Sequence, residues 1–126
     1  MTRASDPGEA ERLSGMNADI VQRQVDAYNR RDLDDFLNFY HPETEVYNLS
    51  EMEPVIKGVH ELREVYGRIF RESPALHCEV EYRKIYGDFF IDGEFVTGLK
   101  SFPDGLRTGV IYQVVDRRIR TVWFTR

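Results

Sequence analysis

The hydrophobic spacing of this sequence changes once, near Leu76. Before that point, apolar residues recur three or four positions apart, which is typical of one face of an α-helix. After it they alternate with polar residues, which is typical of half-buried β-strands. Helices followed by strands predict an α+β domain in which the helices pack on one face of an antiparallel sheet.

Three helices are expected before the change of spacing. The first begins near Asn17, a good N-cap residue, and the second lies between Asp32 and Pro42. The third covers 58–72. A short strand, "EVYNL", is expected between the second and third helices.

Residues 1–16 are polar and aperiodic, so we expect a disordered tail before a single domain at 17–126. The chain has 41% hydrophobic and 31% charged residues, an ordinary globular balance. A net charge of -5 argues against nucleic acid as a partner, and no apolar run approaches the roughly 20 residues of a membrane span. A single cysteine, Cys78, fits a cytoplasmic protein without an internal disulfide.

Turn residues at 87–88, 103–105 and 116–117 divide the rest of the chain into a four-stranded meander. If no strand contains a bulge, Tyr82 lies beneath the helices, while Asp92 and Glu94 face solvent. The same registers place Tyr112, Val114 and Trp123 together on the outer face of the sheet. An apolar patch of this kind predicts a homodimer packed through that face.

The sequence resembles the nuclear transport factor two-like superfamily, and within it the SnoaL-like and steroid delta-isomerase-like proteins. The resemblance rests on "VDAYNRRDLDDFLNFYHPETEVYNL", "VIKGVHELREVYGRIF" and "VVDRRIRTVWF", and spans about Asn17 to Arg126. The shared sequence features include the Tyr28-Asn29 pair and Gly58 at the start of the third helix.

The resemblance implies a cone-shaped, cystatin-like roll, in which a curved sheet wraps a long helix and leaves an apolar pocket at the open end. It also implies where the steroid isomerases hold their catalytic groups. The proton-shuttling Asp corresponds to Asn48, the donor Tyr to Gln24, and the protonated Asp to a position near Ile111. None of these residues can take the corresponding role, so steroid isomerisation by that mechanism is not expected.

Six neutral polar side chains are candidates for ligand binding inside such a pocket. They are Asn48, Gln113, Tyr28, Tyr40, Tyr66 and Tyr82. The alternative is that the tyrosines are core aromatics and that Asn48 satisfies the end of a strand.

Asp92 and Glu94 lie two positions apart and therefore point to the same side of their strand. A like-charge neighbour, Glu81, could raise the pKa of Glu94, but a solvated face with Arg83 beside Asp92 is the favoured interpretation. The three histidines show no metal-ligand spacing and no phosphate-binding loop is present, so neither a cofactor nor a metal is expected.

These patterns favour a pocket protein that binds a compact, mostly apolar ligand. If it is an enzyme, the resemblance points to cofactor-independent isomerase, cyclase or hydratase chemistry, although the sequence identifies no catalytic residue. The alternative is a non-catalytic ligand-binding or dimerisation module. An enzyme should hold an ionisable group in the pocket; the expected registers bring only Arg120 near it, which favours binding.

Overall fold

A computed structural model describes residues 7–126 of the chain. Its three helices are α1 (Pro7–Arg30), α2 (Leu33–Asn38) and α3 (Gly58–Glu72). Its six strands are β1 (Tyr40–Asn48), β2 (Ile56–Lys57), β3 (His77–Tyr86), β4 (Phe89–Thr97), β5 (Leu106–Val115) and β6 (Arg118–Phe124). None of the described helices is long and apolar enough to cross a membrane.

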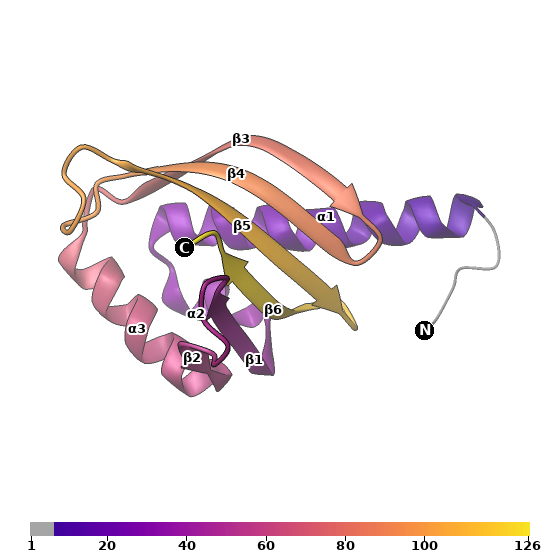
Figure 1. Cartoon of the computed structure of the whole chain (residues 1–126), viewed down its shortest axis with the longest axis horizontal. Coiled ribbons are helices and arrows are strands. Elements are labelled where there is room, and N and C mark those ends of the chain that lie inside the picture. Colours follow the sequence, from indigo (N-terminus) through magenta and orange to yellow (C-terminus); the bar gives the residue numbers. More distant parts are fainter. Residues whose placement is uncertain (1–6) are drawn as a thin grey trace.

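The strands form one curved sheet in the order β2-β1-β6-β5-β4-β3, with the helices on its concave side (Figure 1). Strands β3 to β6 form the antiparallel meander that the sequence predicted. Strand β1 joins the sheet parallel to β6, so the sheet is mixed rather than purely antiparallel. The predicted α+β fold is confirmed.

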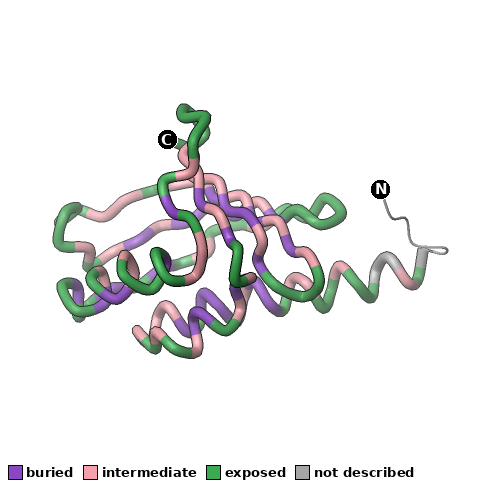
Figure 2. Tube along the Cα trace, turned by 90° about the horizontal axis from the view of Figure 1, so that it is seen from below, coloured by how far each residue is buried: buried purple, intermediate pink, exposed green. Residues whose placement is uncertain are grey.

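Helix α1 begins at Pro7, ten residues before the start that Asn17 suggested. Pro7 suits a first helical turn, and Glu9 interacts favourably with the helix dipole there. This part of α1 extends past the sheet, and its chain is largely exposed in Figure 2. Leu13 and Met16 are 48% and 41% exposed, so this part of α1 presents no buried apolar stripe by which the sequence could reveal it. Residues 1–6 of the expected tail lie outside the described part of the chain.

Local contacts explain why the first two helices meet the sheet where they do. The Asn29 side chain pairs with the backbone of Cys78, donating to its carbonyl oxygen at 3.0 Å and accepting from its N–H at 2.7 Å. These two hydrogen bonds hold the end of α1 against β3. Asp32 caps α2 by accepting from the N–H of Asp35 at 3.1 Å.

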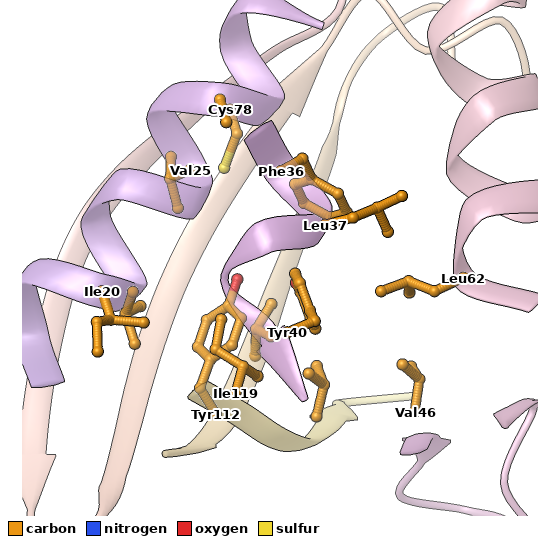
Figure 3. Packing of buried hydrophobic residues seen from close by; sticks show 14 of the residues in the cluster. Ile20, Val25, Phe36, Leu37, Tyr40, Val46, Leu62, Cys78, Tyr112 and Ile119 are labelled. Atoms are coloured by element: carbon orange, nitrogen blue, oxygen red, sulfur yellow. The ribbon is translucent and has the colours of Figure 1, made fainter. Parts of the chain in front are cut away.

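The core lies between the helices and the concave face of the sheet. Figure 3 shows that all three helices and the sheet contribute to it. Phe36 occupies the centre of an aromatic group, with its ring centroid 4.9 Å from that of Tyr66 and 5.0 Å from that of Tyr40. Helix α3 thus packs against α2 and β1, but a space remains between it and the middle of the sheet.

Two β-bulges change the expected registers. Tyr82 pairs with Gly93 as predicted, but Val80 pairs with Glu94, so Glu81 is an extra residue in β3. A second irregularity between β5 and β6 leaves Arg120 as the extra residue. Beyond each extra residue, the side chains point to the face of the sheet opposite to the one expected without a bulge.

The consequence for the sheet faces is a correction to the sequence-based assignment. Asp92 and Glu94 lie on the concave face and are 0% and 6% exposed. Tyr112 and Val114, which were expected outside, are buried on the same face. Trp123 lies on the convex face as expected, where it pairs with Ile111.

Candidate active site

A cavity of about 210 Å³ lies between the helices and the concave face of the sheet. Its helical wall is mostly aromatic and aliphatic, with Gln24, Val25, Tyr28, Phe36, Leu62, Tyr66 and Ile69. Its sheet wall contains Tyr40, Val46, Cys78, Glu94, Val96, Leu106, Thr108, Tyr112, Val122 and Phe124. Leu99, Ser101, Phe102 and Arg126 complete the lining. An apolar cavity with few polar groups is the usual form of a small-molecule site.

A chain of hydrogen bonds crosses the sheet wall and ends at Glu94. The Tyr40 hydroxyl donates to Gln24 Oε1 at 2.9 Å, and Gln24 Nε2 donates to the Tyr112 hydroxyl at 3.1 Å. Tyr112 in turn donates to Glu94 Oε2 at 3.1 Å. All four side chains line the cavity, and the donors are oriented so that the carboxylate is the final acceptor.

The pKa of Glu94 is raised from an ordinary 4.5 to about 7. Burial is the largest cause and the negative charge of nearby Asp92 the second, while hydrogen bonds from Cys78 and Tyr112 act in the opposite direction. Near neutral pH this carboxyl group therefore exists in both protonation states. That is the condition under which a side chain can both take and return a proton.

Asp92 is also buried, and it forms an ion pair with Arg83. The Arg83 guanidinium donates to both carboxylate oxygens, at 2.6 Å and 2.9 Å, and a third bond at 3.2 Å reaches Gln22 of α1. This bidentate pair explains how two carboxylates can share one buried strand face. Of these two carboxyl groups, Asp92 pairs with Arg83, whereas Glu94 accepts from the neutral hydroxyl of Tyr112.

Three of the six predicted ligand-binding residues line the cavity: Tyr28 from α1, Tyr40 from β1 and Tyr66 from α3. Burial raises the pKa of each tyrosine, that of Tyr66 to about 12. Their hydroxyls therefore stay protonated at neutral pH and can donate hydrogen bonds.

The other three predicted residues do not line this cavity. Asn48 lies at the end of β1, where its side chain donates to Glu51 Oε2 at 2.9 Å instead of pointing into the pocket. Tyr82 and Gln113 lie on the convex face, because the bulge in β3 changes the facing of β4 and of β5, which pairs regularly with it. Gln113 accepts from the Thr121 hydroxyl at 3.0 Å, and Tyr82 is 58% exposed. Arg120 binds the backbone of Glu43 rather than the cavity.

Glu94 is the residue that the sequence-based assignment misplaced. Its spacing from Asp92 was visible, and so was the alternation of both with Phe90 and Val96, which are buried on the same face. The opposite face of β4 is more apolar in sequence, and this led to the wrong choice of face. Among the described residues, no group of three or more histidine, cysteine, aspartate or glutamate side chains is arranged to hold a metal ion.

The model of the SnoaL-like domain family matches residues 21–122, which include the cavity, its hydrogen-bond chain and most of the sheet. The chain belongs to the SnoaL-like domain family. This confirms the resemblance to the nuclear transport factor two-like superfamily. No curated protein matches the SnoaL-like sequence significantly.

Solved structures share the fold of this SnoaL-like protein at low sequence identity. A cystatin-fold protein from Novosphingobium aromaticivorans has a TM-score of 0.79 and 19% identity, over 87% of this chain and 97% of its own. A candidate SnoaL-like polyketide cyclase from a Jannaschia species has a TM-score of 0.72 and 15% identity, over 98% and 90%. A protein from Catenulispora acidiphila with a ketosteroid isomerase-like fold has a TM-score of 0.68 and 11% identity, over 85% and 84%. At these identities the comparisons show the fold alone.

Proposed function

We propose that this SnoaL-like protein binds a compact, mostly apolar molecule in its cavity and moves a proton on it, as an isomerase, cyclase or hydratase does. Glu94 is the proposed general acid and base. The observation that carries the proposal is a buried carboxyl group, at the wall of an apolar cavity, with a pKa of about 7. The expected registers had brought only Arg120 near the pocket; Glu94 is the ionisable group that an enzyme requires there.

The surroundings of Glu94 suit this role. In the ionised form, the carboxylate accepts from Tyr112 and can remove a proton from a ligand carbon or from water. The protonated form is stabilised by the low polarity of the cavity, so returning the proton requires no large change in the site. Two carboxyl states of similar free energy permit transfer in both directions near neutral pH.

The alternative is a non-catalytic binding module, in which protonated Glu94 serves only as a hydrogen-bond donor. Glu94→Gln separates the two, because glutamine keeps the shape and a donor but cannot exchange a proton. The assay is deuterium incorporation from D₂O into a panel of small ketones, followed by NMR. Catalysis predicts exchange with the wild type and its loss in Glu94→Gln, while Glu79→Gln, at an exposed site on β3, keeps it.

Exchange at the same rate in Glu94→Gln and the wild type would contradict a role for Glu94 as the base. Ligand binding that Glu94→Gln retains, with no exchange by the wild type for any compound that binds, would favour the binding module.

We also propose a homodimer through the convex face of the sheet, with a corrected set of residues. The Trp123 ring lies between those of Tyr47 and Phe89, at 6.2 Å from each, and Phe89 is 39% exposed. Tyr112 and Val114 do not belong to this face. Sedimentation should find a dimer that Trp123→Asp dissociates and that Met52→Asp, at a 94% exposed loop position, leaves intact. A monomeric wild type at micromolar concentration would contradict it.

A further inference from the structure

The exposed part of the cavity lining comes from the loop between β4 and β5 and from the residues that follow β6. The inner wall is closed to solvent, since Gln24 and Glu94 are 2% and 6% exposed. Ser101 and Arg126 line the cavity but are exposed, and Phe102 is 42% exposed. Ser101, Phe102 and Arg126 therefore form the mouth through which a ligand enters.

Arg126 is held at this mouth by its backbone and by an aromatic ring. Its carbonyl oxygen accepts from the N–H of Ser50 at 2.9 Å, and its own N–H donates to the carbonyl oxygen of Phe124 at 2.8 Å. The guanidinium carbon lies 4.7 Å from the centroid of the Phe124 ring. A guanidinium over a ring is held through its face, and its five N–H donors lie in its plane, where they remain free for hydrogen bonds.

The Arg126 guanidinium has no acidic partner. Among residues 7–126 it forms no ion pair, whereas Arg107, which also lies over an aromatic ring, pairs with Glu81 at 3.3 Å. Its charge still acts on the interior: burial is the largest cause of the raised pKa of Tyr28 and of Tyr66, and Arg126 opposes it at both. The guanidinium is therefore close enough to attract an anion that enters the cavity.

The charges of the lining are placed apart, the acid inside and the cation at the mouth. No ion pair joins Glu94 to Arg126. An anion at the inner wall would be repelled by the Glu94 carboxylate, whereas an anion at the mouth would meet the unpaired guanidinium. The fork of one guanidinium matches the two oxygens of a carboxylate, while a doubly charged phosphate would exceed the single positive charge. Ser101 and Thr108 add hydroxyl groups to the same lining.

We infer that the ligand is an amphipathic monoanion, whose carboxylate binds to Arg126 at the mouth while its apolar body extends toward Glu94. This rests on the proposed function and adds the charge of the ligand and its orientation. A carboxylate at the mouth keeps water on one side, so its binding avoids the full cost of burying a charge. Arg126 thus determines specificity, by favouring acids over their neutral analogues, and takes no part in the proton transfer.

The test compares cyclohexanecarboxylate with its neutral analogue, cyclohexanecarboxamide, by NMR titration of the isotope-labelled protein. The wild type should bind the carboxylate about ten-fold more tightly, the effect of one charge-assisted pair of hydrogen bonds. Arg126→Gln should abolish this preference by weakening carboxylate binding about ten-fold without changing amide binding, and Arg126→Lys should keep part of it. Arg107→Gln is the matched control, because Arg107 lies over the Phe95 ring but outside the cavity lining, and it should change neither constant.

Equal binding of the two probes by the wild type would overturn the inference, as would a preference that Arg126→Gln retains. An equal loss in Arg126→Gln and Arg107→Gln would assign the preference to overall charge and would also overturn it. Tighter binding of cyclohexyl phosphate than of the carboxylate would overturn the choice of anion, and no binding of the carboxylate up to millimolar concentration would overturn the whole inference. A failure of the proposed function looks different: the carboxylate would still bind through Arg126, but no ketone would exchange deuterium through Glu94.

Discussion

Replacing Glu94 by glutamine should change how the stability of the protein depends on pH. The native carboxyl group has a pKa of about 7 against an ordinary 4.5, so the folded state holds a proton that the unfolded state has lost between those values. Stability falls with rising pH wherever the folded state binds more protons than the unfolded state. The contribution of Glu94 is therefore complete below about pH 4.5 and is lost as pH rises through about 7.

The size of the effect follows from the two pKa values. One pKa unit corresponds to about 1.4 kcal/mol, so the full contribution is about 3 kcal/mol, of which about 2.5 kcal/mol is lost between about pH 5 and about pH 8. Glutamine does not titrate. The unfolding free energy of Glu94→Gln minus that of the wild type should rise by about 2.5 kcal/mol over this interval.

Urea unfolding followed by the fluorescence of Trp123, the single tryptophan, measures both proteins across this pH range. Other titrating groups are common to both proteins and cancel in the difference. Glu79→Gln, at an exposed position, is the matched control and should run parallel to the wild type. Parallel curves for Glu94→Gln and the wild type would show that Glu94 has an ordinary pKa, and the argument for its role as acid and base would fail.

Four further substitutions test the surroundings of Glu94 and the backbone at two glycines. Asp92→Asn removes the second cause of the raised pKa of Glu94, so NMR titration should find that pKa below about 7 but still above 4.5, because burial remains. Arg83→Met leaves Asp92 buried without its partner and should destabilise the protein by about 3–5 kcal/mol in urea unfolding. Gly98→Ala should cost about 1–2 kcal/mol or more, because φ is +77° and the new Cβ would clash with the backbone oxygen of Ala75. Gly15→Ala, in open space within α1, should instead stabilise by about 0.5–1 kcal/mol in the same assay.

The meander was predictable because its turns are marked by glycine, proline and aspartate, and α3 because its apolar stripe packs on the core. The facing of β4 was not predictable from spacing alone. Cys78 and Val80 do face the helices as the alternation of β3 predicts, but the extra residue Glu81 separates their pairing from that of Tyr82. A bulge adds one residue to a strand. When polar and apolar residues alternate both before and after that residue, the sequence does not show where it lies.

Only part of the pocket was predicted, because the facing of helical residues follows from the sequence whereas that of strand residues near a bulge does not. Tyr28 and Tyr66 sit on helices, where the 3.6-residue period fixes which side faces the core, and both line the cavity. Tyr82 follows the extra residue of β3, and Gln113 lies on β5, which pairs with β4 without a bulge and so shares its unexpected facing; both lie on the convex face. Asn48 shares the facing of Val46, but at the last position of β1 its side chain turns to Glu51.

The burial of Asp92 and Glu94 also shows why counting apolar residues selected the wrong face of β4. A carboxylate on a buried face is costly only if it must remain charged without a partner. Asp92 avoids that cost through Arg83, whose side chain is itself only 17% exposed. Glu94 avoids it by holding a proton. One strand face thus carries a carboxylate paired with Arg83 next to a carboxyl group without a cationic partner among the described residues, and of the two only Glu94 lines the cavity. That difference, and not the number of acidic residues, is why the proton-transfer role is proposed for Glu94.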